Sequence, residues 1–348
     1  MNGDIRAWLA RLILCLLLPA SAAWAQGFAG LGEEAEGFAL PSPGPAFAFP
    51  RDHGAHPRYR IEWWYLTAAL TDAEGRSYGA QWTLFRSALS PEGPQVWMGH
   101  MGVTTEGAHF TGERLARGGI GQAGVEAAPF AAWIDDWRMD GRDANGIDRL
   151  TLVAREGQAG FDLALSAQGP LVFHGDGGFS VKSSAGQASY YYSQPFYDVT
   201  GTLHLPEGEV EVTGRGWLDR EWSSQPLEPG QEGWDWFSLH LDDGGRLMAF
   251  RLRGEAPFAY ASWIAPDGTL TSYGADDLIL DPLGRATVAG RDVPVRWRLA
   301  LPAEGVDMTV EAVNPDAWQA TLFPYWEGPV RARGSRSAVG YLEMTGYE

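Results

Sequence analysis

The chain has 348 residues, 45% of them hydrophobic and 12% aromatic, and its 44 acidic and 26 basic residues give a formal net charge of −18. This acidity argues against nucleic acid as a partner, because nucleic-acid phosphates bind basic surfaces. The only cysteine, Cys15, lies in a segment that we expect to be removed, so the mature chain has no thiol for a disulfide, a nucleophile or a metal site. The length exceeds that of a usual single domain and predicts two domains.

Residues 1–25 have the three-part pattern of a secretory signal peptide: basic residues, the apolar run Leu12 to Leu18, and small residues that end at Ala23-Trp24-Ala25. We therefore expect cleavage near Ala25 and a periplasmic or secreted mature protein. The apolar run is too short to span a bilayer, and no later stretch approaches the roughly 20 apolar residues that a spanning helix needs. The sequence predicts no transmembrane segment in the mature chain.

Residues 26–50 are rich in Gly, Pro and Ala and lack periodicity, so we interpret them as a linker. From Tyr59 onward, short stretches rich in aromatic and β-branched residues alternate with turn residues at intervals of about ten residues, which is typical of antiparallel strands. Asp-Gly pairs provide residues that tolerate the positive φ of hairpin turns. The sequence therefore predicts an all-β fold. The predicted strands cover residues 63–70, 77–85, 148–155, 160–166, 209–216, 236–241, 246–252 and 293–301.

A weak internal repeat divides the chain into two similar units. The aromatic segment 63–65 leads through a strand to Asp, Gly and Arg, and the aromatic segment 234–237 leads to the same residue types. The offset is roughly 170 residues, close to the size of a lipocalin-type barrel. We therefore predict two tandem lipocalin-like antiparallel β-barrels, at residues 51–197 and 198–348.

The densest group of residues with chemical potential lies at 217–222. Strand alternation places Trp217, Asp219 and Glu221 on one face of this segment. A carboxylic acid that is held against an aromatic surface stays protonated near neutral pH and can act as a general acid, so Asp219 and Glu221 are the candidate catalytic residues. The alternative is structural: Arg215 or Arg220 pairs with these carboxylates, and the group only closes a barrel.

The second group is the aromatic strand that follows Glu62. Alternation places Glu62 and Trp64 on one face. These side chains either fill a barrel core, with Glu62 paired to Arg58 or Arg60, or line a cavity for an apolar ligand. The 14 tryptophans that follow residue 25 exceed what one core needs and favour the cavity. The candidate ligand-binding residues are Glu62, Trp64, Tyr191, Trp217, Trp222, Trp234 and Trp236.

The sequence shows no sign of a metal or cofactor site. His53 and His56 lie in the approach to the first strand, and His100 and His109 have no partner at metal-ligand spacing. No nucleophile elbow, phosphate loop or dinucleotide fingerprint occurs. We expect neither a metal nor a cofactor.

Several ordered motifs of the chain resemble the AttH family, which is related to carotenoid 1,2-hydratase (CrtC, hydroxyneurosporene synthase). The resemblance implies two lipocalin-like barrels with a ligand cavity at or between them. For the hydratases it also implies cofactor-free addition of water to an isoprenoid double bond. The motifs that carry the resemblance are residues 60–65, 171–178, 188–193, 217–224, 233–237 and 340–347.

The hydratase segment has an Asp in a Leu-Asp turn and then a Trp-x-Trp strand, which match Asp219, Trp234 and Trp236 here. The resemblance implies that Asp219 or Glu221 protonates the alkene, while the two tryptophans and Tyr191 stabilise the resulting cation through their π faces. The chain differs from the hydratases in its Asp-Arg-Glu-Trp sequence and in its signal peptide.

These observations leave the function open between two main interpretations. In the first, the protein binds a hydrophobic isoprenoid or lipid-like small molecule and acts on it by acid-catalysed hydration or hydrolysis. In the second, it is a non-catalytic carrier or accessory protein of an ABC-type exporter, since AttH proteins are associated with membrane transport. A third interpretation is an envelope structural protein that uses its aromatic surface as an interface.

Overall fold

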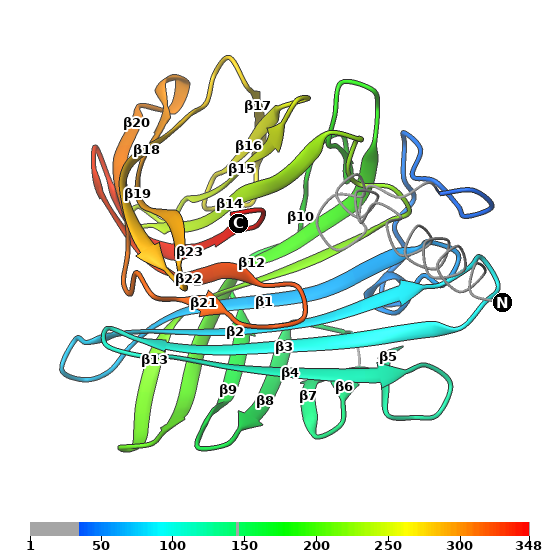
Figure 1. Cartoon of the computed structure of the whole chain (residues 1–348), viewed down its shortest axis with the longest axis horizontal. Helices are drawn as coiled ribbons and strands as arrows, with labels where there is room; N and C mark the ends of the chain where they lie inside the picture. Colours follow the sequence, from blue (N-terminus) through cyan, green and yellow to red (C-terminus); the bar gives the residue numbers. More distant parts are fainter. Residues whose placement is uncertain (1–34, 144–145, 348) are drawn as a thin grey trace, which may run out of the picture.

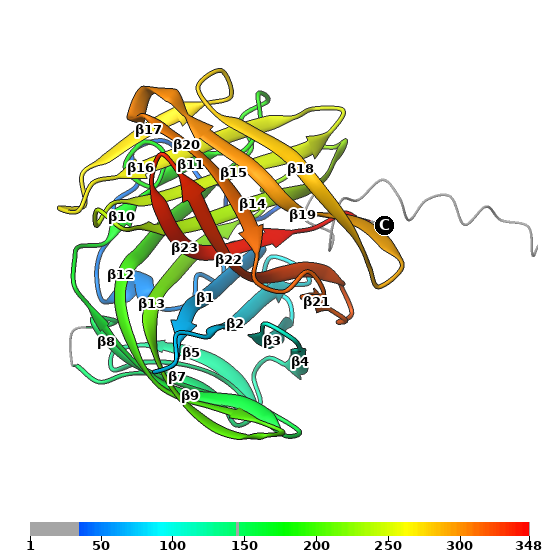
Figure 2. The same cartoon turned by 90° about the vertical axis from the view of Figure 1, so that its left-hand side faces the viewer.

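The structure is a computed structural model that describes residues 35–143 and 146–347. Within this part the chain forms two antiparallel sheets, each curled toward a barrel (Figure 1), which confirms the predicted all-β fold with tandem lipocalin-like barrels. Two views at right angles place the second sheet, coloured yellow to red, against strands β1 and β2 of the first (Figure 2). The predicted signal peptide lies outside the described residues. No helix in the described ranges is long and apolar enough to cross a membrane.

The first sheet has the strand order β4-β3-β2-β1-β13-β12-β9-β8-β7-β6-β5, and the short strands β10 and β11 also pair with β12. A short 3-10 helix, η2 (Arg51–His53), precedes it. The strands of this sheet are β1 (Ile61–Thr71), β2 (Ser77–Ala88), β3 (Gln95–Thr105), β4 (His109–Arg117), β5 (Ala123–Ala127), β6 (Phe130–Ile134), β7 (Trp137–Gly141), β8 (Arg149–Glu156), β9 (Ala159–Ala167), β10 (Val172–Phe173), β11 (Phe179–Val181), β12 (Ala188–Leu205) and β13 (Gly208–Ser223).

The second sheet has the strand order β17-β16-β15-β14-β23-β22-β20-β19-β18, and β21 pairs with β22. A second 3-10 helix, η3 (Pro302–Glu304), connects β19 to β20. The strands are β14 (Gln231–Leu241), β15 (Arg246–Gly254), β16 (Phe258–Ile264), β17 (Leu270–Gly274), β18 (Ile279–Val288), β19 (Arg291–Leu301), β20 (Val306–Ala312), β21 (Trp318–Gln319), β22 (Tyr325–Gly334) and β23 (Ser337–Met344).

The sequence has four Asp-Gly pairs, at residues 140–141, 176–177, 243–244 and 267–268, and in three of them the glycine lies in a turn with a positive φ angle. Gly177, Gly244 and Gly268 have φ angles of 58°, 91° and 88°, which residues with a Cβ rarely adopt. The fourth glycine, Gly141, instead ends strand β7. A fifth glycine allows a close approach: a Cβ on Gly79 of β2 would lie 2.7 Å from Pro329 of β22, so this position brings the two sheets together.

The two sheets divide the chain at a different place from the predicted boundary. Residue 197 lies inside β12, which pairs with β9 on one side and β13 on the other. Residues 213–223 of β13 in turn pair with the whole length of β1. Residues 198–223 therefore complete the first sheet, and the chain passes to the second sheet between Ser223 and Gln231.

The described part of the predicted linker packs against the first sheet. The ring of Phe47 lies 4.9 Å from that of Phe173 and 5.7 Å from that of Trp222, and Ala39 N donates to Arg58 O. These residues form an arm that covers aromatic side chains of the first barrel.

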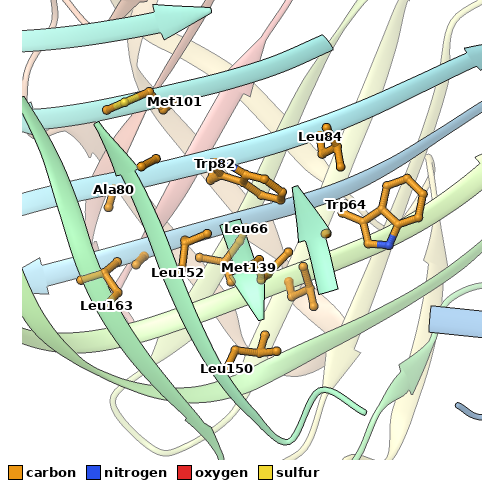
Figure 3. Packing of buried hydrophobic residues seen from close by; sticks show 14 of the residues in the cluster. Trp64, Leu66, Ala80, Trp82, Leu84, Met101, Met139, Leu150, Leu152 and Leu163 are labelled. Carbon is orange, nitrogen blue, oxygen red and sulfur yellow. The ribbon is translucent and has the colours of Figure 1, made fainter. Parts of the chain in front are cut away.

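Alternation assigns the two faces of β1 and β13 as the sequence predicts. One face, with Trp64, Leu218 and Trp222, belongs to the core of the first barrel, part of which is shown in Figure 3. The opposite face, with Tyr65 and Trp217, belongs to a separate apolar cluster that also contains residues of the second sheet. The first sheet therefore presents a second apolar face to its neighbour.

Candidate ligand site between the two sheets

A cavity of about 180 Å³ lies between the two sheets. One wall comes from β1, β2, β3, β12 and β13, and the other from β14, β15, β22 and β23. An apolar cavity of about 150 Å³ accepts a benzene ring, so this cavity has room for one end of an apolar molecule. The aromatic residues that line it are Trp63, Tyr65, Phe85, Tyr191, Trp234, Trp236, Phe250, Phe323 and Tyr325.

The structure brings most of the candidate site residues to this cavity. Asp219, Glu221, Glu62, Tyr191, Trp234 and Trp236 line it. Trp217 lies directly behind the wall, where its Nε1 donates to Asp219. Trp64 and Trp222 do not line it, because alternation turns them into the core of the first barrel.

Asp219 is a buried carboxyl with three hydrogen-bond donors. Tyr191 Oη donates to its Oδ2 at 2.9 Å, Trp217 Nε1 donates to its Oδ1 at 2.6 Å, and Ser193 Oγ donates to Oδ1 as well. Burial raises the pKa of Asp219 to about 7, because loss of solvation outweighs these hydrogen bonds and the nearby Glu221 carboxyl acts in the same direction as burial. A substantial fraction of the Asp219 carboxyls is therefore protonated near neutral pH.

Glu221 lies two residues along the same strand in a different electrostatic environment. Lys182 Nζ lies 3.0 Å from its Oε1, and Ser189 Oγ donates to the same oxygen. Of the two candidate acids, Glu221 therefore has a cationic partner, whereas burial raises the pKa of Asp219.

The opposite wall carries two further acids that the sequence analysis missed. Glu343 lines the cavity and accepts a hydrogen bond from Trp234 Nε1 at 2.7 Å, while Glu327, its cross-strand neighbour, accepts one from Tyr65 Oη at 2.5 Å. Burial raises the pKa of both Glu343 and Glu327, and the charge of Asp219 contributes to the rise at Glu343. The carboxyls of the two walls therefore interact across the cavity.

Glu62 borders the cavity, but its carboxylate is held by three neighbouring side chains. Its carboxylate lies 2.8 Å from Arg220 Nη2, 3.0 Å from Arg86 Nε and 2.6 Å from His56 Nδ1. Burial would raise the pKa of Glu62, but these three partners together hold it well below its usual range. Arg220 therefore pairs with Glu62 on the core face of β13, and Arg215 pairs with Asp198, so neither arginine neutralises Asp219 or Glu221.

Weak signals for the missed residues exist in the sequence. Lys182 is its only lysine, and alternation places Tyr65 beside Trp63. Glu343 lies in a motif that carries the family resemblance, but no local pattern marks it as part of a cavity. Among the described residues, no group of three or more His, Cys, Asp or Glu side chains is arranged to hold a metal ion.

Residues 40–347 match the AttH-like family, which covers most of the chain and confirms the resemblance of the motifs. The chain belongs to the AttH-like family. No curated protein matches it.

Solved structures share the fold of this AttH-like chain. A candidate AttH protein from Nitrosomonas europaea is 34% identical, with a TM-score of 0.81 over 89% of this chain and 99% of that one. Kievitone hydratase from Nectria haematococca is 13% identical, with a TM-score of 0.66 over 89% and 96% of the two chains. CghA, solved with Sch210972, is 14% identical, with a TM-score of 0.52 over 90% and 97%. The last two are similar in fold.

The raised pKa of Asp219 predicts a specific dependence of stability on pH. A carboxyl whose pKa rises from 3.8 to about 7 on folding stabilises the folded state fully below the lower value. This contribution is lost as the pH rises toward the higher value. Asp219→Asn lacks the titration, so we expect its free energy of unfolding, relative to the wild type, to increase by a few kcal/mol between about pH 4 and about pH 8.

Urea denaturation of the two proteins at several pH values measures this difference. Glu343 titrates in both proteins, so most of its effect cancels. A difference that stays constant over this range would show that Asp219 has an ordinary pKa.

Proposed function

We propose that this AttH-like protein is exported to the periplasm, binds one end of an apolar isoprenoid or lipid-like molecule between its two sheets, and adds water across a carbon–carbon double bond of that molecule. The observation that carries this proposal is the buried carboxyl of Asp219 in an aromatic cavity, where burial raises its pKa to about 7. A general acid must hold its proton at the working pH, and a pKa near 7 meets that condition. The three-part pattern of residues 1–25 supports export.

In the proposed reaction, Asp219 transfers its proton to one carbon of the double bond, and the other carbon becomes a tertiary cation. A water molecule then forms a bond to this cation through its oxygen. The proton released from that water returns to the Asp219 carboxylate, so the acid is restored. The sum is one alkene plus one water giving one alcohol, and no cofactor takes part.

The cavity supplies stabilisation for a cation. Tyr191, Trp234 and Trp236 line it, and aromatic faces attract positive charge. On the opposite wall, Glu343 gains stability for its charged form when a cation is nearby. The positive charge of Lys182 is balanced by Glu221, so it does not oppose the reaction strongly.

The fold of kievitone hydratase fits this proposal, but the reaction rests on the residues of the cavity. The alternative is a carrier that passes the same kind of ligand to an ABC-type exporter. In that case the cavity binds the ligand and Asp219 only completes a hydrogen-bonded wall.

Solvent extraction and native mass spectrometry of protein purified from its own periplasm test the proposal. We expect one apolar molecule per chain, and incubation of the protein with the unsaturated form in oxygen-labelled water should yield an alcohol that carries the label. A bound lipid that is never converted would favour the carrier. A protein without any bound or bindable apolar molecule would contradict both functions.

A further inference from the structure

Lys182 is the only lysine in a sequence with 26 Lys and Arg residues, and the structure places it at the cavity. It follows β11 at the base of a hairpin in which Lys182 N donates to Gln187 O. Gln231 Nε2, from the first strand of the second sheet, donates to Lys182 O at 3.1 Å. Both sheets therefore fix the position of this residue.

The ammonium of Lys182 has more N–H donors than there are oxygen acceptors around it in the described residues. Its side chain is 9% exposed, and among the described residues Nζ reaches one acidic partner, Glu221, at 3.0 Å. The faces of Tyr191 and Phe250 lie 4.8 and 4.5 Å from Nζ, one ring from each sheet. A lysine ammonium has three N–H donors, and ring faces do not replace oxygen acceptors. The remaining donors are available to a molecule in the cavity.

We propose that Lys182 binds an oxygen atom at the polar end of the ligand, so that the substrate is an oxygenated apolar molecule, such as a ketone, rather than a pure hydrocarbon. This inference rests on the proposed function, because it concerns the ligand of the same cavity. Glu221 compensates the charge of Lys182, which favours a neutral oxygen over an anionic carboxylate as the acceptor. The oxygen then fixes the orientation of the ligand, while the aromatic walls contact its hydrocarbon part.

Lysine suits this position better than arginine. A lysine carries a compact charge on a flexible stem, whereas the planar guanidinium of arginine makes bidentate pairs with carboxylates. An arginine in place of Lys182 would engage both oxygens of Glu221, and this bidentate pair would fix the plane in which its remaining donors point. The only lysine of the sequence thus lies in a buried ion pair, where its ammonium can bind a ligand oxygen in addition to Glu221.

Two small probes of nearly equal shape test the proposal. One is methylheptenone, a short isoprenoid ketone, and the other is the hydrocarbon in which a methylene group replaces its carbonyl oxygen. Their affinities are measured by quenching of tryptophan fluorescence, since Trp63, Trp234 and Trp236 line the cavity. We expect the wild type to bind the ketone about tenfold more tightly or better, and Lys182→Met to reduce this preference to near one.

The variant Lys182→Met leaves Glu221 without its partner and could lower stability. The double variant Lys182→Met/Glu221→Gln removes both charges together, and it should show the same loss of preference. A purely structural role predicts lower stability of the single variant with an unchanged preference for the ketone. Such a result, in either variant, would overturn the proposal.

Selective isotopic labelling of lysine nitrogen gives a second readout, because a single ε-ammonium signal arises from the whole chain. The ketone should shift this signal more than the hydrocarbon does. If the hydrocarbon binds and the wild type shows no preference for the ketone, the proposal that Lys182 binds a ligand oxygen is wrong. The proposed binding of apolar ligands in the cavity then still holds. If neither probe binds, the proposed function fails, and this inference fails with it.

Discussion

Replacing Asp219 by asparagine is expected to lower the rate of double-bond hydration by about 10²–10⁴-fold, the range that general acid catalysis contributes. Asparagine has nearly the same shape, and its amide oxygen can still accept the hydrogen bonds of Trp217 and Ser193. Its NH2 group then replaces the oxygen that accepts from Tyr191, and the tyrosine hydroxyl can accept a hydrogen bond from it. The asparagine amide has no proton that it can transfer to a carbon atom. The ligand should therefore still bind, and single-turnover kinetics with the extracted ligand should show slow conversion.

Glu221→Gln is the matched control, because it removes the neighbouring carboxyl of the same strand and keeps its shape. We expect a much smaller decrease in rate, since the proposed reaction takes its proton from Asp219, and Glu221 is paired with Lys182. Equal losses in the two variants would show that the pair acts as a unit. Full activity of Asp219→Asn would refute its assignment as the acid.

The second large effect concerns stability. Arg220→Met should lower the free energy of unfolding by about 3–5 kcal/mol, the usual cost of removing one partner of a buried ion pair. Both Arg220 and Glu62 are almost fully buried, and the guanidinium also donates to Trp63 O at 2.6 Å and Gly54 O at 2.8 Å. It lies 3.9 Å from the ring centre of Trp64. Methionine fills part of this space, but the carboxylate keeps only its contacts with Arg86 and His56, and the two carbonyl oxygens lose the hydrogen bonds of the guanidinium.

Urea denaturation measures this loss, with Arg298→Met as the control. Arg298 makes a bidentate pair with Asp307, but their side chains are 43% and 56% exposed. Exposed pairs contribute about 0–1 kcal/mol, so this control should change stability little. Similar losses in the two variants would mean that Glu62 finds sufficient compensation from Arg86 and His56.

Strand alternation predicted the faces of the site correctly, but it could not predict what each face contacts. It placed Asp219 with Trp217 and Glu62 with Trp64, as the structure has them. A period of two residues defines relative faces only, and both faces of β1 and of residues 216–223 in β13 are largely buried here. Trp64 and Trp222 were therefore assigned to the ligand, although they fill the barrel core.

The other misses depend on contacts between distant segments. Lys182 and Glu343 reach the cavity through the packing of two sheets, which leaves no local signature in either stretch. The division between the two sheets falls later in the chain than the predicted domain boundary for a related reason. β12 extends through residue 197, and β13 returns to pair with β1. The first sheet therefore includes residues that lie after the end of the predicted first domain.

The cavity belongs to neither sheet alone, since Asp219 and Tyr191 come from the first and Trp236 and Glu343 from the second. The binding site exists only while the two halves are docked, so ligand affinity and the docking equilibrium are thermodynamically linked. A ligand of the proposed kind would act as a core residue that both halves share, because it would contact apolar side chains from each of them.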